Sequence, residues 1–209
     1  MTRVTTLIVA FALLGCATTA PPQTPSPRLD PGLEATDAQG QLQAFIEIPA
    51  GTIAKFEVDK ATGAVVQDIK DGKPRFVAFL PYPSNYGMIP KTMSATEDGG
   101  DGDPLDVLVL GPALSRGEVV PIRLIGVLEL LDGGEADDKL VAVPLTPGPR
   151  NPFAHYQTLA ELRERQPEVL EIVALWFSAY KGPGEMTLKG WGGPDRAQAI
   201  LDAAQLAPR

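Results

Sequence analysis

Short apolar runs separated by turn signals make up most of the chain from Gln43 onward. The segment 53–58 alternates polar and apolar positions, as a half-buried strand does. The Asp71-Gly72 dipeptide predicts a tight hairpin turn before a further strand at 75–79. Continuous apolar runs predict buried strands at 45–48, 64–66, 107–110, 119–129 and 140–143. Short strands at this spacing indicate a small closed barrel.

The last third of the chain shows helical periodicity instead. The predicted helices are 158–165, 168–180 and 194–205, and Pro167 suits the first turn of the second helix. An apolar stripe at helical spacing predicts the face of that helix that packs on the barrel: Val169, Ile172, Val173, Trp176 and Tyr180. The pattern therefore predicts an α+β fold, mainly β, in which helices flank a closed barrel.

The amino-terminal segment has the character of an export signal. Arg3 precedes an apolar stretch from Val4 to Leu14 that is too short to cross a bilayer. The segment 13–16, Leu-Leu-Gly-Cys, resembles the bacterial lipobox, in which the chain is cut before the Cys and the Cys is lipidated. This predicts a lipoprotein signal peptide at 1–15 and lipidation of Cys16. An ordinary signal peptide with an incidental Cys, or a buried amino-terminal strand, is the alternative.

The export signal fixes the expected location and the domain boundaries. We expect the protein to be exported and lipid-anchored to a bacterial membrane, facing the periplasm or the cell exterior. Five prolines between residues 17 and 40 predict an extended tether over 16–40. The folded domain is then expected at 41–209.

Residue counts narrow the chemistry. The chain has 26 acidic and 18 basic residues, a net charge of −8, which argues against a nucleic-acid partner. The single Cys excludes an intrachain disulfide, and the single His excludes a multi-His metal site. Metal chemistry in this chain must therefore use oxygen ligands, which suit Mg²⁺, Mn²⁺ or Ca²⁺.

The acidic segment Asp101–Asp106, with the sequence DGDPLD, is the most informative motif. Its three carboxylates repel one another, so a fold that gathers them needs a cation. An EF-hand loop beginning at Asp101 would need Glu at its twelfth position, where the chain has Pro112. A solvated acidic turn is the alternative to a metal site.

Two further clusters mix acids with cations, as a site for metal and phosphate requires. They are Asp132, Asp137 and Lys139 after the strand 119–129, and Glu47, Lys55, Glu57 and Arg75 on the early strands.

Taken in order, these motifs resemble the soluble family I inorganic pyrophosphatases. The matching segments are Ile46–Pro49, Lys55–Glu57, Arg75-Phe76, Asn85–Gly87, Asp101–Leu108, Asp132 and Asp137–Leu140. The resemblance runs from about residue 43 to Trp191. It implies a five-stranded OB-like closed barrel with flanking helices, here in an exported lipoprotein version.

The resemblance also implies roles for individual residues. Several Mg²⁺ ions, with Mn²⁺ as a substitute, would be held by Asp101, Asp106, Asp132, Asp137, Glu57 and Glu47. Asp103 would be the general base, with Tyr86 and Arg75 also at the catalytic centre. The phosphoryl groups would be bound by Lys55, Arg75, Tyr86, Lys139, Tyr180 and Lys181.

The implied reaction is hydrolysis of pyrophosphate to two phosphates by direct attack of a metal-activated water. A broader phosphoanhydride or nucleotide hydrolase on the same scaffold is one alternative. The other is a non-catalytic surface lipoprotein that binds metal or phosphate. The expected partners are pyrophosphate and, through the lipid anchor alone, a membrane, while a homo-oligomer stays open.

Overall fold

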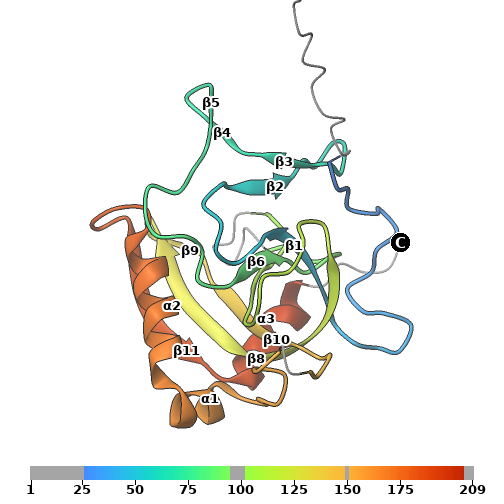
Figure 1. Ribbon diagram of the computed structural model, residues 1–209, viewed down its shortest axis with the longest axis vertical. Helices are drawn as coiled ribbons and strands as arrows, with labels where there is room; N and C mark the ends of the chain where they lie inside the picture. Colours follow the sequence, from blue (N-terminus) through green and yellow to red (C-terminus); the bar gives the residue numbers. More distant parts are fainter. Residues whose placement is uncertain (1–25, 95–101, 149–150, 205–209) are drawn as a thin grey trace, which may run out of the picture.

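Five strands of the computed structural model pair in a closed ring, and the structure describes residues 26–94, 102–148 and 151–204. The ring order is β1-β6-β7-β10-β8, and β8 returns to β1 (Figure 1). The bounds are β1 Gln43–Ile48, β6 Asn85–Met88, β7 Asp106–Val109, β8 Val119–Asp132 and β10 Lys139–Pro144. The ring matches the predicted five-stranded closure and flanking helices, although β6 has no apolar alternation that would predict it.

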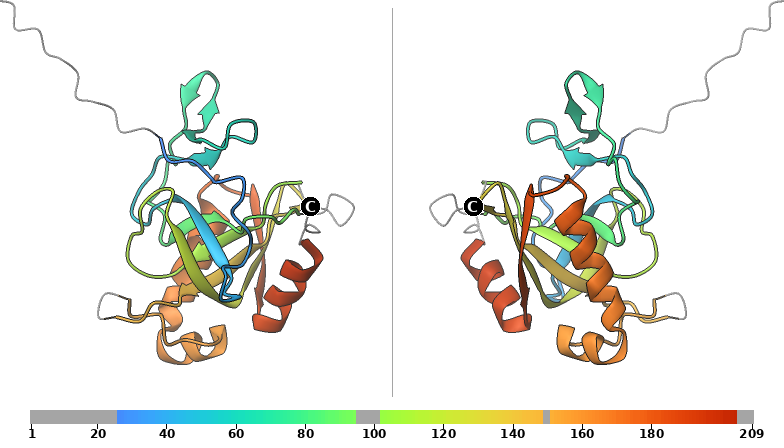
Figure 2. Two further views of the ribbon diagram at one scale, coloured as in Figure 1. Left: turned by 90° about the vertical axis from the view of Figure 1, so that its right-hand side faces the viewer. Right: turned by 90° about the vertical axis from the view of Figure 1, so that its left-hand side faces the viewer.

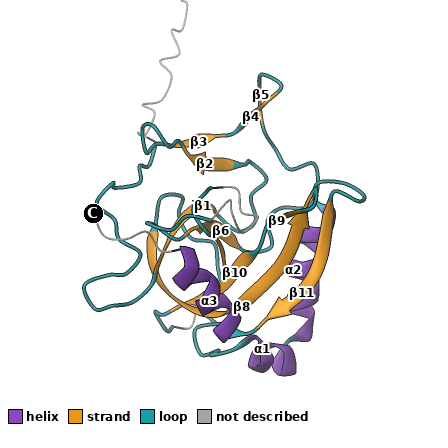
Figure 3. Ribbon diagram, turned by 180° about the vertical axis from the view of Figure 1, so that it is seen from behind, coloured by secondary structure: helices purple, strands orange, loops and turns teal. Residues whose placement is uncertain are grey.

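The long strand β8 closes the ring because its two halves have different partners. Its first residues pair with β1, with Pro121 opposite Gln43, while the segment 122–128 pairs with β10. Its last part also pairs with β11 (Met186–Gly192) and the short β9 (Glu135–Ala136), which extend the sheet outside the ring (Figure 3). The pairing of β7 with β10 is parallel, and the others in the ring are antiparallel.

Two small hairpins stand outside the ring, above β1 and β6 in Figure 1. The first consists of β2 (Phe56–Val58) and β3 (Val65–Gln67), and the second of β4 (Ile69–Lys70) and β5 (Lys73–Pro74). The turn at Asp71-Gly72 is confirmed, with both residues at positive φ. The predicted strand at 75–79 is wrong, since only Phe76 forms an isolated bridge, with Ala54. Phe76 and Phe79 are 55% and 41% exposed, so the apolar run there does not mark a buried strand.

In the part of the chain that the structure describes, three helices flank the strands. Thr158 caps the amino terminus of α1 (Leu159–Arg165), and Pro167 begins α2 (Pro167–Ala179). These two helices pack against one core cluster, and α3 (Pro194–Ala204) packs against another. Figure 2 shows α3 on one side of the strands and α1 and α2 on the other.

The buried face of α2 differs from the predicted stripe. Ile172 is 58% exposed, whereas Leu170, Ala174 and Phe177 are buried together with Val173 and Trp176. The helix is apolar around most of its circumference, so periodicity alone does not determine which side contacts the strands.

The residues before β1 pack on the domain. The backbone N–H of Leu29 donates to Gly63 O at 2.8 Å, and that of Val65 donates to Pro27 O at 2.9 Å. Leu29 and Leu33 pack against a small core cluster that contains Val65. The folded part thus reaches back to Pro27, inside the segment assigned to the tether by its composition. Cys16 and residues 1–15 lie outside the described residues, and no helix in the described part is long and apolar enough to cross a membrane.

Candidate active site

A buried lysine, Lys139, lies at the centre of the acidic site. Its side chain is 3% exposed, and its Nζ lies 2.5 Å from Asp106 Oδ2 and 2.6 Å from Asp137 Oδ1. The parallel pairing of β7 with β10 sets Leu140 opposite Val107, which brings the preceding residues Lys139 and Asp106 together at the ends of the two strands. Burial lowers the pKa of Lys139, but the charges of Asp106 and Asp137 outweigh it and raise that pKa well above its usual range.

Asp137 has an unsatisfied oxygen. Its Oδ2 is buried without a hydrogen-bond partner, and burial raises the pKa of its carboxyl despite the neighbouring Lys139. A buried carboxylate oxygen without a partner suits a hard cation such as Mg²⁺. Among the described residues no three acidic, His or Cys side chains are grouped tightly enough to hold a metal. Asp101, the first acid of the DGDPLD motif, lies outside the described residues.

Two more predicted acids face lysines. Lys181, which follows α2, donates to Asp132 Oδ2 at the end of β8. Lys60, in the turn between β2 and β3, donates to Asp103 Oδ1. Three ammonium groups thus face these four carboxylates: Lys60 pairs with Asp103, Lys181 pairs with Asp132, and Asp106 and Asp137 share Lys139.

The cations on the early strands form a second group. Lys55 Nζ lies 2.9 Å from Glu57 Oε2 and 3.2 Å from Asp68 Oδ2, and Arg75 Nη1 lies 2.9 Å from the same oxygen of Asp68. Lys55, Glu57 and Arg75 are brought together as the sequence predicts. Asp68 was not predicted, although the hairpin turn at 71–72 sets residue 68 directly opposite residue 75.

Glu47 interacts with the acidic group around Lys139 and with the cationic group around Lys55. It is 7% exposed, and its Oε1 accepts a hydrogen bond from the backbone N–H of Val58 at 2.8 Å. Burial raises its pKa to about 8, a shift to which the negative charge of Asp106 also contributes and which the positive charge of Lys55 opposes. Glu47 is thus close enough to interact with a member of each cluster.

Aromatic side chains form the wall of the site. Tyr86 stacks on Phe177 at 6.3 Å between ring centroids, and Tyr180 stacks on Trp176 at 4.7 Å. Burial raises the pKa of both tyrosines, and for Tyr86 the charge of Asp106 adds to the effect. Both hydroxyls therefore stay protonated at neutral pH and are able to donate to an anion.

Lys60 was missed in the sequence because nothing in a turn between two short strands marks it. In the structure, Lys60 of the first hairpin forms an ion pair with Asp103 of the DGDPLD motif. Sequence position alone could not reveal that contact, since the two residues are 43 positions apart.

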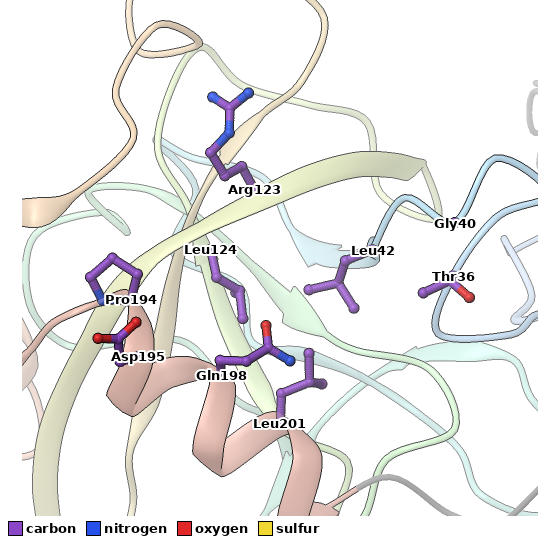
Figure 4. A pocket seen from close by; sticks show the side chains of 9 residues that line it. All are labelled: Thr36, Gly40, Leu42, Arg123, Leu124, Pro194, Asp195, Gln198 and Leu201. Atoms are coloured by element: carbon purple, nitrogen blue, oxygen red, sulfur yellow. The ribbon is translucent and has the colours of Figure 1, made fainter.

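A separate cavity lies between the loop before β1, the first half of β8 and α3 (Figure 4). Leu42, Leu124 and Leu201 supply apolar side chains, and Figure 4 shows Arg123 pointing away from them. The guanidinium of Arg123 donates to the carbonyls of Ala154 and Tyr156. Leu124 is eight residues before Asp132 on the same strand, so this cavity is remote from the acidic site.

The ring fold and these clusters define a class of protein: a mainly β chain that gathers carboxylates and cations around a ring of strands. A sequence profile of the inorganic pyrophosphatase family matches residues 44–207, and the chain belongs to that family. It is therefore an enzyme, a hydrolase of the inorganic pyrophosphatase class.

Individual relatives agree. An inorganic pyrophosphatase of Xylella fastidiosa is 35% identical over 182 residues, which cover 83% of this chain and 94% of that protein. One from Ralstonia nicotianae is 38% identical over 176 residues, 79% of this chain and 90% of that protein. The solved inorganic pyrophosphatase of Helicobacter pylori superposes with a TM-score of 0.69 at 31% identity, covering 83% of this chain and 96% of that one.

Proposed function

We propose that this enzyme hydrolyses inorganic pyrophosphate to two phosphates with the help of Mg²⁺, and that it works outside the cytoplasm. The observation that carries the proposal is the buried Lys139 between Asp106 and Asp137. Buried charges are tolerated in a fold when they are paired. Here the paired charges belong to Lys139, a proposed phosphate-binding cation, and to Asp106 and Asp137, two proposed metal ligands.

The chemistry of the proposed ligands suits a divalent hard cation, because all of them are carboxylates. They are Asp101, Asp106, Asp132 and Asp137, with Glu57, which contacts Lys55, and Glu47. When bound, Mg²⁺ would neutralise charge on pyrophosphate and lower the pKa of a water enough for it to attack phosphorus. Mn²⁺ has the same preference for oxygen and would substitute.

The chain's own residues bind the anion and move the proton. Lys55 and Arg75, with Lys139 and Lys181, attract the two phosphoryl groups, and the hydroxyls of Tyr86 and Tyr180 donate to them. Asp103 accepts the proton of the attacking water. Transition-state charge is thereby stabilised by groups already fixed in place.

The proposed location depends on Cys16. The lipobox-like sequence precedes the folded part, whose described contacts begin near Pro27. We propose that the signal peptide is removed and that a lipid on Cys16 holds the enzyme at a bacterial membrane.

A substrate panel tests the activity. The full chain is assayed with Mg²⁺ on pyrophosphate, tripolyphosphate, a nucleoside triphosphate and a phosphomonoester, with EDTA as the metal-free control. We expect turnover of pyrophosphate that EDTA abolishes. Turnover of nucleotides without turnover of pyrophosphate would favour the broader hydrolase, and no turnover at all would favour the non-catalytic lipoprotein.

The general base is tested by Asp103→Asn. We expect kcat to fall by about 10²- to 10⁴-fold, the usual contribution of a positioned base. Mg²⁺ binding, followed by calorimetry, should be largely kept, because Asp103 is not among the proposed ligands. A variant with wild-type kcat would remove Asp103 from this role.

A further inference from the structure

A carboxylate outside the expected site residues, Asp68, lies between two of the phosphate-binding cations. Its Oδ2 lies 3.2 Å from Lys55 Nζ and 2.9 Å from Arg75 Nη1. Its side chain is 17% exposed, less than Lys55 at 25% and Arg75 at 28%. One carboxylate oxygen, less exposed than its partners, therefore contacts two long cationic side chains.

The backbone keeps the three residues together without fixing their side chains. The N–H of Asp68 donates to Lys55 O at 3.0 Å, that of Arg75 to Asp68 O at 2.7 Å, and that of Lys55 to Arg75 O at 3.1 Å. The β4–β5 hairpin lies between Asp68 and Arg75, so its tight turn sets the register that pairs them. Lys and Arg side chains keep several rotatable bonds, and orienting them needs a partner.

The charge of Asp68 has the wrong sign for attracting substrate. Burial raises the pKa of Asp68, but Arg75 and Lys55 outweigh it, so its pKa lies below the usual value and it is ionised at neutral pH. A negative charge here weakens the attraction of both cations for a polyanion. Its benefit must therefore be geometric: it offsets the mutual repulsion of Lys55 and Arg75 and holds them in one arrangement.

We infer that Asp68 is a positioning residue that holds Lys55 and Arg75 in the arrangement that binds the phosphoryl groups of pyrophosphate. The inference rests on the proposed function. It separates two kinetic effects: loss of the carboxylate misplaces the cations and lowers kcat, while loss of its negative charge leaves KM unchanged or lower. Misplacement by about 1 Å costs on the order of 10²-fold in rate.

The test compares Asp68→Ala and Asp68→Asn with the control Asp71→Asn. Asp71 lies exposed in the same hairpin at a φ of 53°, a conformation that Asn tolerates well. With saturating Mg²⁺, we expect Asp68→Ala to lower kcat about 10- to 100-fold without raising KM. Asp68→Asn keeps an oxygen for Arg75 and should recover part of the loss, and Asp71→Asn should match the wild type.

A second readout measures coupling to the partner. If Asp68 acts through Arg75, Asp68→Ala should cost at least about threefold less in an Arg75→Ala background than in the wild type. Binding of imidodiphosphate, a non-hydrolysable pyrophosphate analogue, is followed by calorimetry for the same variants, and melting temperatures report any loss of folding. Asp68→Asn keeps the test valid if Asp68→Ala folds poorly.

Two results would overturn the inference: wild-type kcat in Asp68→Ala, or an equal loss in both Arg75 backgrounds. Wild-type kcat together with a lower KM would mean that Asp68 acts only through its negative charge, which weakens substrate binding. These outcomes all require a wild-type enzyme that turns over pyrophosphate, so a wild type without turnover contradicts the proposed function instead.

Discussion

At the scale of single residues, Lys139 shows how the site is built around compensated charge. It is 3% exposed between two carboxylates, and its removal would leave Asp106 and Asp137 facing each other. We expect Lys139→Met to destabilise the chelator-treated protein by about 3 kcal/mol, near the lower end for a broken buried pair, because both acids keep partial access to water.

Metal should reverse that loss. If Asp106 and Asp137 bind Mg²⁺, the ion replaces the missing ammonium, so millimolar Mg²⁺ should stabilise Lys139→Met more than the wild type. Denaturant unfolding with EDTA and with Mg²⁺ measures both effects. The exposed Lys189→Met serves as the control and should unfold like the wild type. Equal Mg²⁺ stabilisation of all three proteins would argue against a metal at these acids.

Glu47 gives a prediction on pH. Its pKa is about 8 in the folded protein and near 4.5 as an unperturbed carboxyl, so the fold prefers the protonated form. The stability from this group is complete below about pH 4.5 and is lost as the pH rises through 8, at about 1.4 kcal/mol per unit of pKa difference. The neutral Glu47→Gln keeps an oxygen for the N–H of Val58 and lacks this loss.

Unfolding free energies in EDTA at pH 5 and pH 8.5 measure the difference. We expect the wild type to lose up to several kcal/mol more than Glu47→Gln over that interval. The exposed Glu135→Gln, on β9, should follow the wild type. Parallel curves for the wild type and Glu47→Gln would contradict the buried, protonated state of Glu47.

At the scale of elements, the approach of β6 to β1 depends on Gly87. A Cβ at this position would overlap the carbonyl oxygen of Phe45, a backbone atom that cannot move without breaking the strand pairing. We expect Gly87→Ala to destabilise the protein by at least about 2 kcal/mol and to lower activity through the neighbouring Tyr86. Gly148→Ala, where a Cβ meets nothing within 4 Å, is the control in the same denaturant unfolding experiment. Equal stability of Gly87→Ala and Gly148→Ala would contradict this role of Gly87.

The same scale shows what the sequence can and cannot predict. The segments that form β7, β8 and β10 are rich in Val, Leu and Ile, and both their existence and their type are predictable. Strand β6 reads Asn-Tyr-Gly-Met, and its pairing depends on the close backbone contact at Gly87 rather than on an apolar pattern. The buried face of α2 could not be predicted without the positions of the strands, because most of the helix surface is apolar.

The contacts of the candidate site also divide into those that the sequence could predict and those that it could not. The hairpin turn at 71–72 implies the pairing of residue 68 with residue 75, so local register could have predicted the contact of Asp68 with Arg75. The approach of Lys139 to Asp106 depends on a parallel pairing between β7 and β10, which the 29 residues 110–138 separate. The order of the motifs predicts that Lys139 and Asp106 belong to the same site, but their direct contact depends on the ring topology, which pairs β7 with β10.

At the scale of the whole molecule, the net charge of −8 bears on the proposed attachment of the enzyme to a membrane. Anionic lipid repels an acidic protein, so electrostatic adsorption cannot hold it there. A lipid chain contributes about 0.8 kcal/mol per buried CH₂ and does not depend on surface charge. Membrane retention should therefore depend on one side chain, Cys16.

We expect Cys16→Ser to move the pyrophosphatase activity from the membrane fraction to the soluble fraction of the host cell without lowering the specific activity. The reason is that Cys16 is not one of the proposed site residues, the first of which in the sequence is Glu47. Ala17→Ser, at the adjacent position, is the matched control and should remain with the membranes. High salt should not release the wild type, because salt weakens only electrostatic attachment. Release by salt, or retention of Cys16→Ser, would mean that something other than a lipid on Cys16 holds the enzyme at the membrane.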